Sequence, residues 1–264
     1  MITHVRQGPN ILPLELKDIN FEARGQRLIK DMNCAFSTKR RNVIIGPNGA
    51  GKSLLLRLCH GLLKPSTGSI EWSGAGANKG REYITHQQAM VFQRPVMLRR
   101  SVSGNIDYAL ALKGVTPSQR REITDNVLQR AGLRRLADQP ARVLSGGEQQ
   151  RLALARVWAL SPEVLFLDEP TANLDPSATH AVEEIIQAIH ETGTCIIMTS
   201  HDLGQARRLA DEVLFLHRGR LLERAPTEQF FDNPQNDLAQ AFVKGELLWW
   251  NRGRDNRKPP KENN

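Results

Sequence analysis

The sequence of 264 residues contains only three cysteines, and none of its apolar runs is long enough to cross a lipid bilayer. A membrane-spanning helix needs about 20 apolar residues. Cys34, Cys59 and Cys195 are odd in number, far apart and set in apolar surroundings. This pattern argues against a disulfide or metal framework and predicts reduced core thiols in a cytosolic protein. The N-terminus lacks a charged segment followed by an apolar core, so secretion is not indicated.

Basic residues exceed acidic ones, 36 against 28, which gives a formal net charge of +8. Such an excess suits nucleic acid, an anionic lipid surface or an acidic ligand. The basic residues occur as scattered pairs, without the aromatic-rich RNA motifs or zinc-finger spacings of nucleic-acid-binding proteins. We therefore favour solvated basic faces together with phosphate binding, and we expect no nucleic-acid partner.

One glycine-rich octapeptide follows a short apolar strand at 42–45 and precedes a helix at 54–59. It matches the phosphate-loop pattern, in which backbone N–H groups turn inward around an anion at a helix N-terminus. We expect the lysine to reach the β- and γ-phosphates of a nucleotide and the serine hydroxyl to hold Mg²⁺. The alternative, an ordinary turn with an exposed lysine, is disfavoured by the strand–loop–helix context. The octapeptide consists of Gly46, Pro47, Asn48, Gly49, Ala50, Gly51, Lys52 and Ser53.

The rest of the chain alternates predicted strands and helices, and its length suits one large α/β domain with a subdomain. We predict a mainly parallel sheet covered on both faces and an antiparallel β-layer formed by 14–21 and 27–36. A charged helical pattern from 102 to 137 predicts an α-helical subdomain inserted at about 94–157. The Gly- and Ala-rich segment 73–80 is predicted to be a flexible loop. Residues 1–13 are interpreted as an extension, 14–248 as the domain and 249–264 as a basic, disordered tail.

Two carboxylates, Asp168 and Glu169, follow the apolar strand predicted at 164–167. A phosphoryl-transfer site needs such acids. We expect Asp168 to bind Mg²⁺, directly or through water, and Glu169 to polarise the attacking water. The competing interpretation is that both acids cap the next helix, near Ser177.

Two further polar residues lie at predicted strand ends, and the carboxyl ends of parallel strands share one edge where ligands bind. His201 follows the strand at 195–199 and is placed to contact the γ-phosphate or orient Glu169. Gln93 ends the strand predicted at 89–93 and could reach Mg²⁺ or the attacking water. A polar strand terminator remains a serious alternative for Gln93.

A second anion site is predicted where Ser145, Gly146 and Gly147 open a helix, because this helix start offers free N–H groups and a hydroxyl. If the helical subdomain holds these residues away from the phosphate loop, the two anion sites of one chain cannot bind the same phosphate, and each is only half of a complete site. That suggests that a second copy of the chain supplies this half-site.

With these motifs in place, the chain resembles an ATP-binding cassette (ABC) ATPase over about 14–248. Residues 144–151, with the sequence LSGGEQQR, match the family signature. The resemblance implies a P-loop NTPase core, ATP and Mg²⁺ as ligands, and a head-to-tail homodimer. In that dimer each ATP lies between 46–53 of one copy and 145–149, including Gln149, of the other.

The resemblance also assigns individual roles. Lys52 belongs to the phosphate loop, Glu169 would be the general base and His201 the switch histidine. Gln93 would couple Mg²⁺ to the membrane partner. Residues 172–175 match the loop that crosses the dimer interface, with Asp175 as its acid.

One position departs from the family pattern. An aromatic residue usually stacks on adenine after the first strand, and alignment from Leu14 places Ala23 there. Arg24 could stack its guanidinium plane instead, or Phe21 could turn inward. The departure puts tight adenine selectivity in doubt but not ATPase activity.

The resemblance points to importers assembled from separate subunits, because the chain has no fused membrane spans and leaves no room for an added regulatory domain. Segments 90–102 and 241–248 are similar to tungstate and related oxyanion importers; phosphate and polar amino-acid importers are alternatives. Expected partners are a second cassette, integral-membrane permease subunits and, indirectly, an extracytoplasmic solute-binding protein. The expected location is the cytoplasmic face of the inner membrane.

A non-transport cassette is the second hypothesis. Repair cassettes carry coiled-coil or zinc insertions that are missing between Ser53 and Leu144, and translation factors carry two cassettes where one is present. A cell-division scaffold would be shorter at the C-terminus and would lack the oxyanion-like segment at 90–102. It is therefore the harder alternative to separate from an importer.

Overall fold

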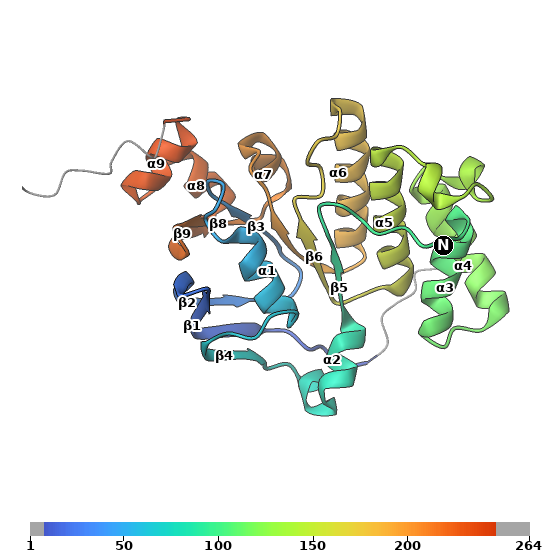
Figure 1. Ribbon diagram of the computed structural model, residues 1–264, viewed down its shortest axis with the longest axis horizontal. Coiled ribbons are helices and arrows are strands. Elements are labelled where there is room, and N and C mark those ends of the chain that lie inside the picture. The colour runs from blue at the N-terminus through green and yellow to red at the C-terminus, as the bar shows by residue number, and fades with distance from the viewer. Residues whose placement is uncertain (1–7, 247–264) are drawn as a thin grey trace, which may run out of the picture.

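A three-stranded antiparallel sheet forms the first layer of the computed structural model, which describes residues 8–246 (Figure 1). Strand β1 (Leu14–Ala23) lies between β2 (Gln26–Phe36) and β4 (Thr67–Trp72). Alternation of polar and apolar residues along β1 buries Leu14, Leu16 and Ile19 on one face. The predicted antiparallel β-layer is confirmed, with β4 as its third strand.

The central sheet has six strands in the order β5-β6-β7-β3-β8-β9. The first five are parallel, and β9 pairs antiparallel with β8. Their bounds are β5 Gln88–Val91, β6 Val164–Asp168, β7 Cys195–Thr199, β3 Arg41–Ile45, β8 Glu212–His217 and β9 Arg220–Pro226. Every residue of β6 and β7 is buried, as expected for strands covered on both faces.

Successive side chains of the central strands point to opposite faces of the sheet and pack in two separate hydrophobic cores. Val164 and Phe166 pack with helix α1 (Lys52–His60) and the antiparallel sheet, whereas Leu165 and Leu167 face the helices on the other side. Figure 1 shows α1 between the two sheets and α5 and α6 on the opposite face of the central sheet. Close packing on both faces of the central sheet therefore fixes the strand ends and the side chains that they carry.

The helical subdomain consists of α3 (Val102–Leu112), α4 (Pro117–Arg130) and α5 (Gly146–Leu160), which pack against one another. Short 3₁₀ turns at Arg134–Leu136 and Ala141–Val143 connect α4 to α5. The remaining helices are α6 (Pro176–Glu191), α7 (Leu203–Leu209), α8 (Thr227–Asp232) and α9 (Asp237–Val243). The predicted α/β fold with an inserted helical subdomain is confirmed.

Two local predictions were wrong. Segment 73–80, predicted to be a flexible loop, contains a 3₁₀ helix at Ala75–Lys79, and helix α2 (Arg81–Gln87) follows it. Strand β5 ends at Val91, so Gln93 lies beyond the strand and does not terminate it. Both differences arise in short segments, where neighbouring elements decide the conformation more than the local residue pattern does.

The N-terminal segment packs onto the domain. Ile11 and Leu12 are buried, and their N–H groups donate to the carboxylate of Glu163 at 2.8 and 3.0 Å. The predicted tail at 249–264 lies outside the described residues, as do positions 247 and 248. Across residues 8–246, no helix combines the length and the apolar character that crossing a membrane requires.

Candidate functional site

The loop between β3 and α1 has the backbone that its glycines predict. Gly46, Gly49 and Gly51 have φ angles of +147°, +78° and +102°, a region that L side chains rarely adopt. A Cβ atom on Gly46 would lie 2.0 Å from the carbonyl oxygen of Leu216. The loop therefore needs glycine at 46 both for its turn and for its close approach to β8.

Lys52 closes this loop from inside. Its side chain is 5% exposed, and its ammonium donates to the carbonyl oxygens of Gly46 at 2.9 Å and Pro47 at 3.3 Å. Burial lowers the pKa of Lys52, while the carboxylates of Glu169 and Asp168 oppose this shift. A buried cation at the base of an open backbone turn suits a phosphate, because the anion would replace the carbonyl partners.

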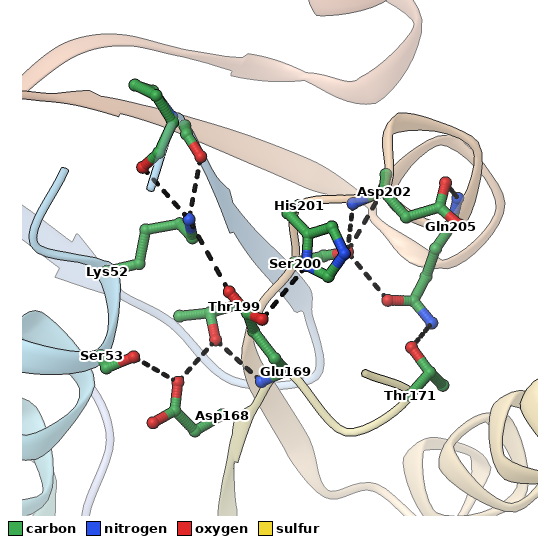
Figure 2. Close-up of polar contacts among 12 residues, drawn as sticks. Lys52, Ser53, Asp168, Glu169, Thr171, Thr199, Ser200, His201, Asp202 and Gln205 are labelled. Atoms are coloured by element: carbon green, nitrogen blue, oxygen red, sulfur yellow. Dashed lines mark hydrogen bonds and ion pairs between the residues drawn. The ribbon is translucent and has the colours of Figure 1, made fainter. Parts of the chain in front are cut away.

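Ser53 and Asp168 meet beside the loop (Figure 2). The Ser53 hydroxyl donates to Oδ1 of Asp168 at 2.7 Å, and the Thr199 hydroxyl donates to the same oxygen at 2.9 Å. Asp168 is 4% exposed, so this carboxylate is buried and held by two hydroxyls. A hydroxyl and a carboxylate oxygen at this spacing fit Mg²⁺, which prefers hard oxygen ligands completed by phosphates and water. Within residues 8–246 there is no cluster of three or more His, Cys, Asp or Glu side chains that could hold a metal by itself.

Glu169 is positioned by its neighbours in an uncommon backbone conformation. Its φ is +46°, and its N–H donates to the Thr199 hydroxyl at 2.9 Å. One carboxylate oxygen lies 3.8 Å from Nζ of Lys52, and the other lies 3.1 Å from Nδ1 of His201. The Thr199 hydroxyl thus links the carboxylate of Asp168 to the backbone of Glu169.

The predicted residues at the strand ends are therefore brought together, with one exception. Asp168 ends β6 and His201 follows β7, which lies between β6 and β3 in the sheet. The competing interpretation, that Asp168 and Glu169 cap the next helix, is wrong because Asp175 caps α6 by accepting from the Ala178 N–H at 2.9 Å. Gln93 is exposed and makes no hydrogen bond or ion pair with the described part of the chain.

Ser145 opens α5 with a capping box. Its hydroxyl accepts from the Glu148 N–H, and the Glu148 carboxylate accepts from the Ser145 N–H at 2.8 Å. The Ser145 hydroxyl also donates to the Glu148 carboxylate at 2.7 Å, and this hydrogen bond, followed by the one from the Ser145 N–H, lowers the pKa of Glu148. The adjacent Gln149 donates its side-chain amide to the Leu144 carbonyl at 2.9 Å. The N-terminus of α5 is therefore ordered before any ligand arrives.

A cavity adjoins this helix start. Ser145, Gly146 and Gly147 line it together with residues of the segment before α6, including Asn173 and Asp175. Its lining, within residues 8–246, includes no residue of 46–53. The two predicted anion-binding half-sites thus lie in separate places within one chain.

The three candidates for adenine contact differ in their environment. Phe21 is half-buried and packs against the core that contains α1, so its ring is already engaged. Arg24 is exposed in the turn between β1 and β2, where its φ is +52°, and makes no hydrogen bond or ion pair with residues 8–246. Ala23 pairs with Gln26 at the end of β1. Of the two proposed substitutes, Arg24 is the one with a free side chain.

Sequence reasoning missed three residues of the site: Thr199, Thr171 and Gln205. Thr199 binds the Asp168 carboxylate and the Glu169 N–H, as described above. Gln205, 1% exposed on α7, donates to the Thr171 hydroxyl at 2.8 Å and accepts from the Ser200 hydroxyl at 2.9 Å. The one available signal was that Thr199 is the only hydrogen-bonding hydroxyl in the otherwise apolar strand Cys195–Thr199.

P-loop ATPases hold and hydrolyse ATP with a glycine-rich turn that is closed by a buried lysine, and with acidic side chains at the ends of neighbouring parallel strands. This chain has that fold and is an ATPase. It belongs to the ABC transporter family, whose model matches residues 29–172.

Curated relatives support the assignment and differ in the solute that their names give. Phosphate import ATP-binding protein PstB 2 of Natronomonas pharaonis is 34% identical, with 85% of this chain and 84% of the relative covered. Tungstate uptake system ATP-binding protein TupC of Peptoclostridium acidaminophilum is 37% identical, with 75% and 92% covered. A probable amino-acid import ATP-binding protein, YxeO of Bacillus subtilis, is 36% identical, with 76% and 84% covered.

Solved structures agree with this. The chain matches cbiO1 of Clostridium perfringens, part of the ABC transporter complex cbiONQ, with a TM-score of 0.75 and 30% identity over 83% of this chain and 90% of that one. It also matches the ATP-binding cassette MJ0796, a dimer in a post-hydrolysis state bound to ADP and Pi. That match has a TM-score of 0.71 and 25% identity over 81% and 98% of the two chains.

Proposed function

We propose that this chain is the ATP-hydrolysing subunit of a membrane importer and works as a head-to-tail homodimer. The observation that carries the proposal is the separation of its half-sites: the cavity beside Ser145 and Gly146 is not lined by the phosphate loop of the same chain. In the dimer, each ATP binds between residues 46–53 of one copy and 145–149 of the other. MJ0796, which the chain resembles, is a dimer in its ADP-bound state.

Each residue of the site then has a defined task. The N–H groups of 46–53 surround the phosphates, and Lys52 exchanges its two carbonyl partners for phosphate oxygens. Ser53 and Asp168 would hold Mg²⁺, which would neutralise phosphate charge. The exposed amide of Gln93 reaches the metal side of the site from beyond the end of β5.

Glu169 acts as the general base for hydrolysis. Its carboxylate accepts a proton from the attacking water, and its contact with His201 at 3.1 Å orients it and leaves His201 next to the γ-phosphate. Asp175, by capping α6, holds 172–175 in the conformation that crosses the dimer interface.

The membrane partner binds the segment that follows β5. Phe92 and Val96 are 38% and 70% exposed in one short segment, and exposed apolar side chains that lie together are typical of protein–protein contact surfaces. ATP binding closes the dimer, the segment from Gln93 to Ser103 moves the permease subunit, and hydrolysis reopens the dimer. The chain lies on the cytoplasmic face of the inner membrane, and a solute-binding protein delivers cargo to the permease from the other side.

The proposed solute is an oxyanion, with tungstate first. The support is the 37% identity to TupC and the resemblance of 90–102 and 241–248 to such importers. Phosphate, itself an oxyanion, is the second candidate because PstB 2 is 34% identical over more of the chain. Amino acids are the third, through YxeO.

The test uses Glu169→Gln, which keeps the size of the side chain and removes its basicity. Full-length protein carrying this substitution is incubated with ATP and detergent-solubilised native membranes, recovered, and analysed by mass spectrometry. We expect an ATP-bound dimer by light scattering and a multi-span permease among the recovered proteins. The associated solute-binding protein is then titrated with tungstate, molybdate and phosphate. A monomer at millimolar ATP, or recovery of soluble partners alone, would contradict the proposal.

A further inference from the structure

The contact between Glu169 and His201 is not held in place by burial. The His201 side chain is 58% exposed, and the carboxylate it meets is 18% exposed. Both residues follow strand ends. The Thr199 hydroxyl anchors the backbone N–H of Glu169, and a buried amide links the two segments beyond that point.

Gln205, on α7, is 1% exposed and links three segments, and Figure 2 shows its contacts with two of them, at Thr171 and Ser200. Its carbonyl oxygen accepts from the Ser200 hydroxyl at 2.9 Å, one residue before His201. Its amide nitrogen donates at 2.8 Å to the Thr171 hydroxyl, two residues after Glu169. The same nitrogen donates to the Glu183 carboxylate of α6 at 3.1 Å.

These links form a closed ring behind the reacting groups. It runs from Glu169 along the chain to Thr171, across Gln205 to Ser200, and along the chain to His201, which contacts Glu169 again. One cavity is lined by all five residues, with Asn173 and Leu174. Asn173 and Leu174 also line the cavity beside Ser145, and Glu169 lies 3.8 Å from Lys52 of the phosphate loop. The ring therefore adjoins both half-sites.

We infer that Gln205 is a positioning residue, which sets the distance between Glu169 and His201 and thereby the rate of ATP hydrolysis. This inference rests on the proposed roles of Glu169 and His201. The hydrogen bonds of the Gln205 side chain go neither to the phosphate loop at 46–53 nor to α5, which begins in the signature segment. Gln205 therefore affects the rate of ATP hydrolysis and not the affinity for ATP.

The chemistry of the site requires an amide at this position. Glu183 is 7% exposed and its carboxylate accepts from the Arg208 guanidinium at 2.7 and 3.0 Å. A carboxylate without a proton can only accept hydrogen bonds, so the group facing it from α7 must donate. A second carboxylate there would lie next to Glu183 in a buried place, where two neighbouring carboxylates disfavour ionisation of both.

The experiment compares Gln205→Glu with the exchanged pair Gln205→Glu/Glu183→Gln in the full chain. In Gln205→Glu, two carboxylates face each other. In the exchanged double variant, the amide that donates the hydrogen bond is on α6 and the carboxylate that accepts it is on α7. Steady-state ATP hydrolysis is measured between about pH 6.5 and about pH 8.5, and each rate is divided by that of the wild type at the same pH. Gln229→Glu makes the same change at an exposed position of α8 and is the control.

We expect Gln205→Glu to lower kcat roughly ten- to hundredfold at the alkaline end with little change in KM, since misplacement of a reacting group costs about that much. The loss should shrink as pH falls, because a proton shared by the two carboxylates restores the donor. The exchanged pair should recover most of the rate at every pH. Because partial unfolding would also lower the apparent kcat without changing KM, each rate is divided by the folded fraction that circular dichroism gives at the same pH.

Gln205→Met, which keeps the length and removes every hydrogen bond without adding charge, decides the question if Gln205→Glu fails to fold. It should lower kcat at all pH values equally. Wild-type kcat in either single variant, a rise in KM that matches the fall in kcat, or an exchanged pair as slow as Gln205→Glu would overturn the inference.

Failure of the proposed function would look different. If Glu169→Gln still turned ATP over, the base would be wrong whatever the Gln205 variants did. If Glu169→Gln were inactive and Gln205→Glu behaved as the wild type, only the positioning inference would fall.

Discussion

The hydroxyl of Ser53 lies 2.7 Å from Oδ1 of Asp168, although 115 residues separate them in the sequence. The pairing is possible because Ser53 stands in the first turn of α1 and Asp168 ends β6, the strand against which α1 packs. The two oxygens that are proposed to hold Mg²⁺ are thus already adjacent in the free protein.

Asp168→Asn should weaken the dependence of hydrolysis on Mg²⁺. The amide keeps the shape and can still accept from Ser53 or Thr199, but it lacks the charge that attracts the cation. We expect the Mg²⁺ concentration for half-maximal rate to rise about ten- to hundredfold, the equivalent of one charged interaction. A Mg²⁺ titration of ATPase rate measures this. Asp107→Asn, at a partly buried ion pair with Arg120 in the helical subdomain, is the control; an equal shift there would refute the assignment.

Lys52→Met should weaken ATP binding. The substitution keeps a side chain in the buried position and removes the only ammonium that contacts the loop carbonyls of Gly46 and Pro47 within residues 8–246. Loss of a charged hydrogen bond predicts a Kd about 10- to 150-fold higher, measured with a fluorescent ATP analogue. Lys64→Met, at an exposed position after α1, should leave the Kd unchanged. Unchanged affinity in Lys52→Met would mean that the loop assignment is wrong.

His60 should make the fold sensitive to acid. It is half-buried at the end of α1 with its ring 5.6 Å from Phe166, its Nδ1 has no partner among the described residues, and burial lowers its pKa below the ordinary 6.5. Below about pH 6.5 the unfolded chain therefore binds a proton that the folded chain does not, and stability falls as pH falls towards the folded pKa.

Urea unfolding of the wild type and His60→Leu, across that pH range, checks this. The free energy of unfolding of the wild type should fall more steeply with acid, by at most about 1.4 kcal/mol per pH unit, the limit for one proton. His86→Leu changes an exposed histidine and should keep the wild-type slope. Parallel curves for the wild type and His60→Leu would show that His60 takes up a proton equally in the folded and the unfolded chain.

Val96→Asp should separate ATP hydrolysis from assembly. Val96 and Val143 are 70% and 69% exposed, and their segments are neighbours because Arg142 donates to the Met97 carbonyl at 3.5 Å. A charge at the centre of an apolar contact should lower permease recovery roughly tenfold or more. The ATPase rate of the isolated subunit should stay as it was. Leu62→Asp, 51% exposed beyond α1, is the matched control, and a loss of permease there alone would move the docking surface.

Strong local patterns made most of the framework predictable. The continuous apolar runs of β6 and β7 allow few alternatives, and the strand predicted at 195–199 has those bounds in the structure. The glycines of 46–53 and the acids after β6 belong to motifs whose spacing is set by the phosphates they surround. Their meeting at one sheet edge followed from parallel pairing alone.

What could not be predicted depends on contacts between distant segments. Helix α2 has only seven residues, among them the β-branched Ile84 and Thr85, and is held by the N-terminal segment, where Tyr83 donates to the Pro9 carbonyl at 2.9 Å. Gln205 was one polar residue in a short helix, and its importance appears only when Thr171 and Ser200 are seen on either side of it.

The left-handed backbone of Glu169, with φ at +46°, carries an evolutionary consequence. A side chain other than glycine or asparagine in this conformation costs about 1 kcal/mol or more, so the chain keeps glutamate here against its own stability. A descendant that no longer hydrolysed ATP would be free to recover that energy. Glycine or asparagine at position 169 of a related chain would therefore indicate a cassette that has kept the fold but has lost ATP hydrolysis.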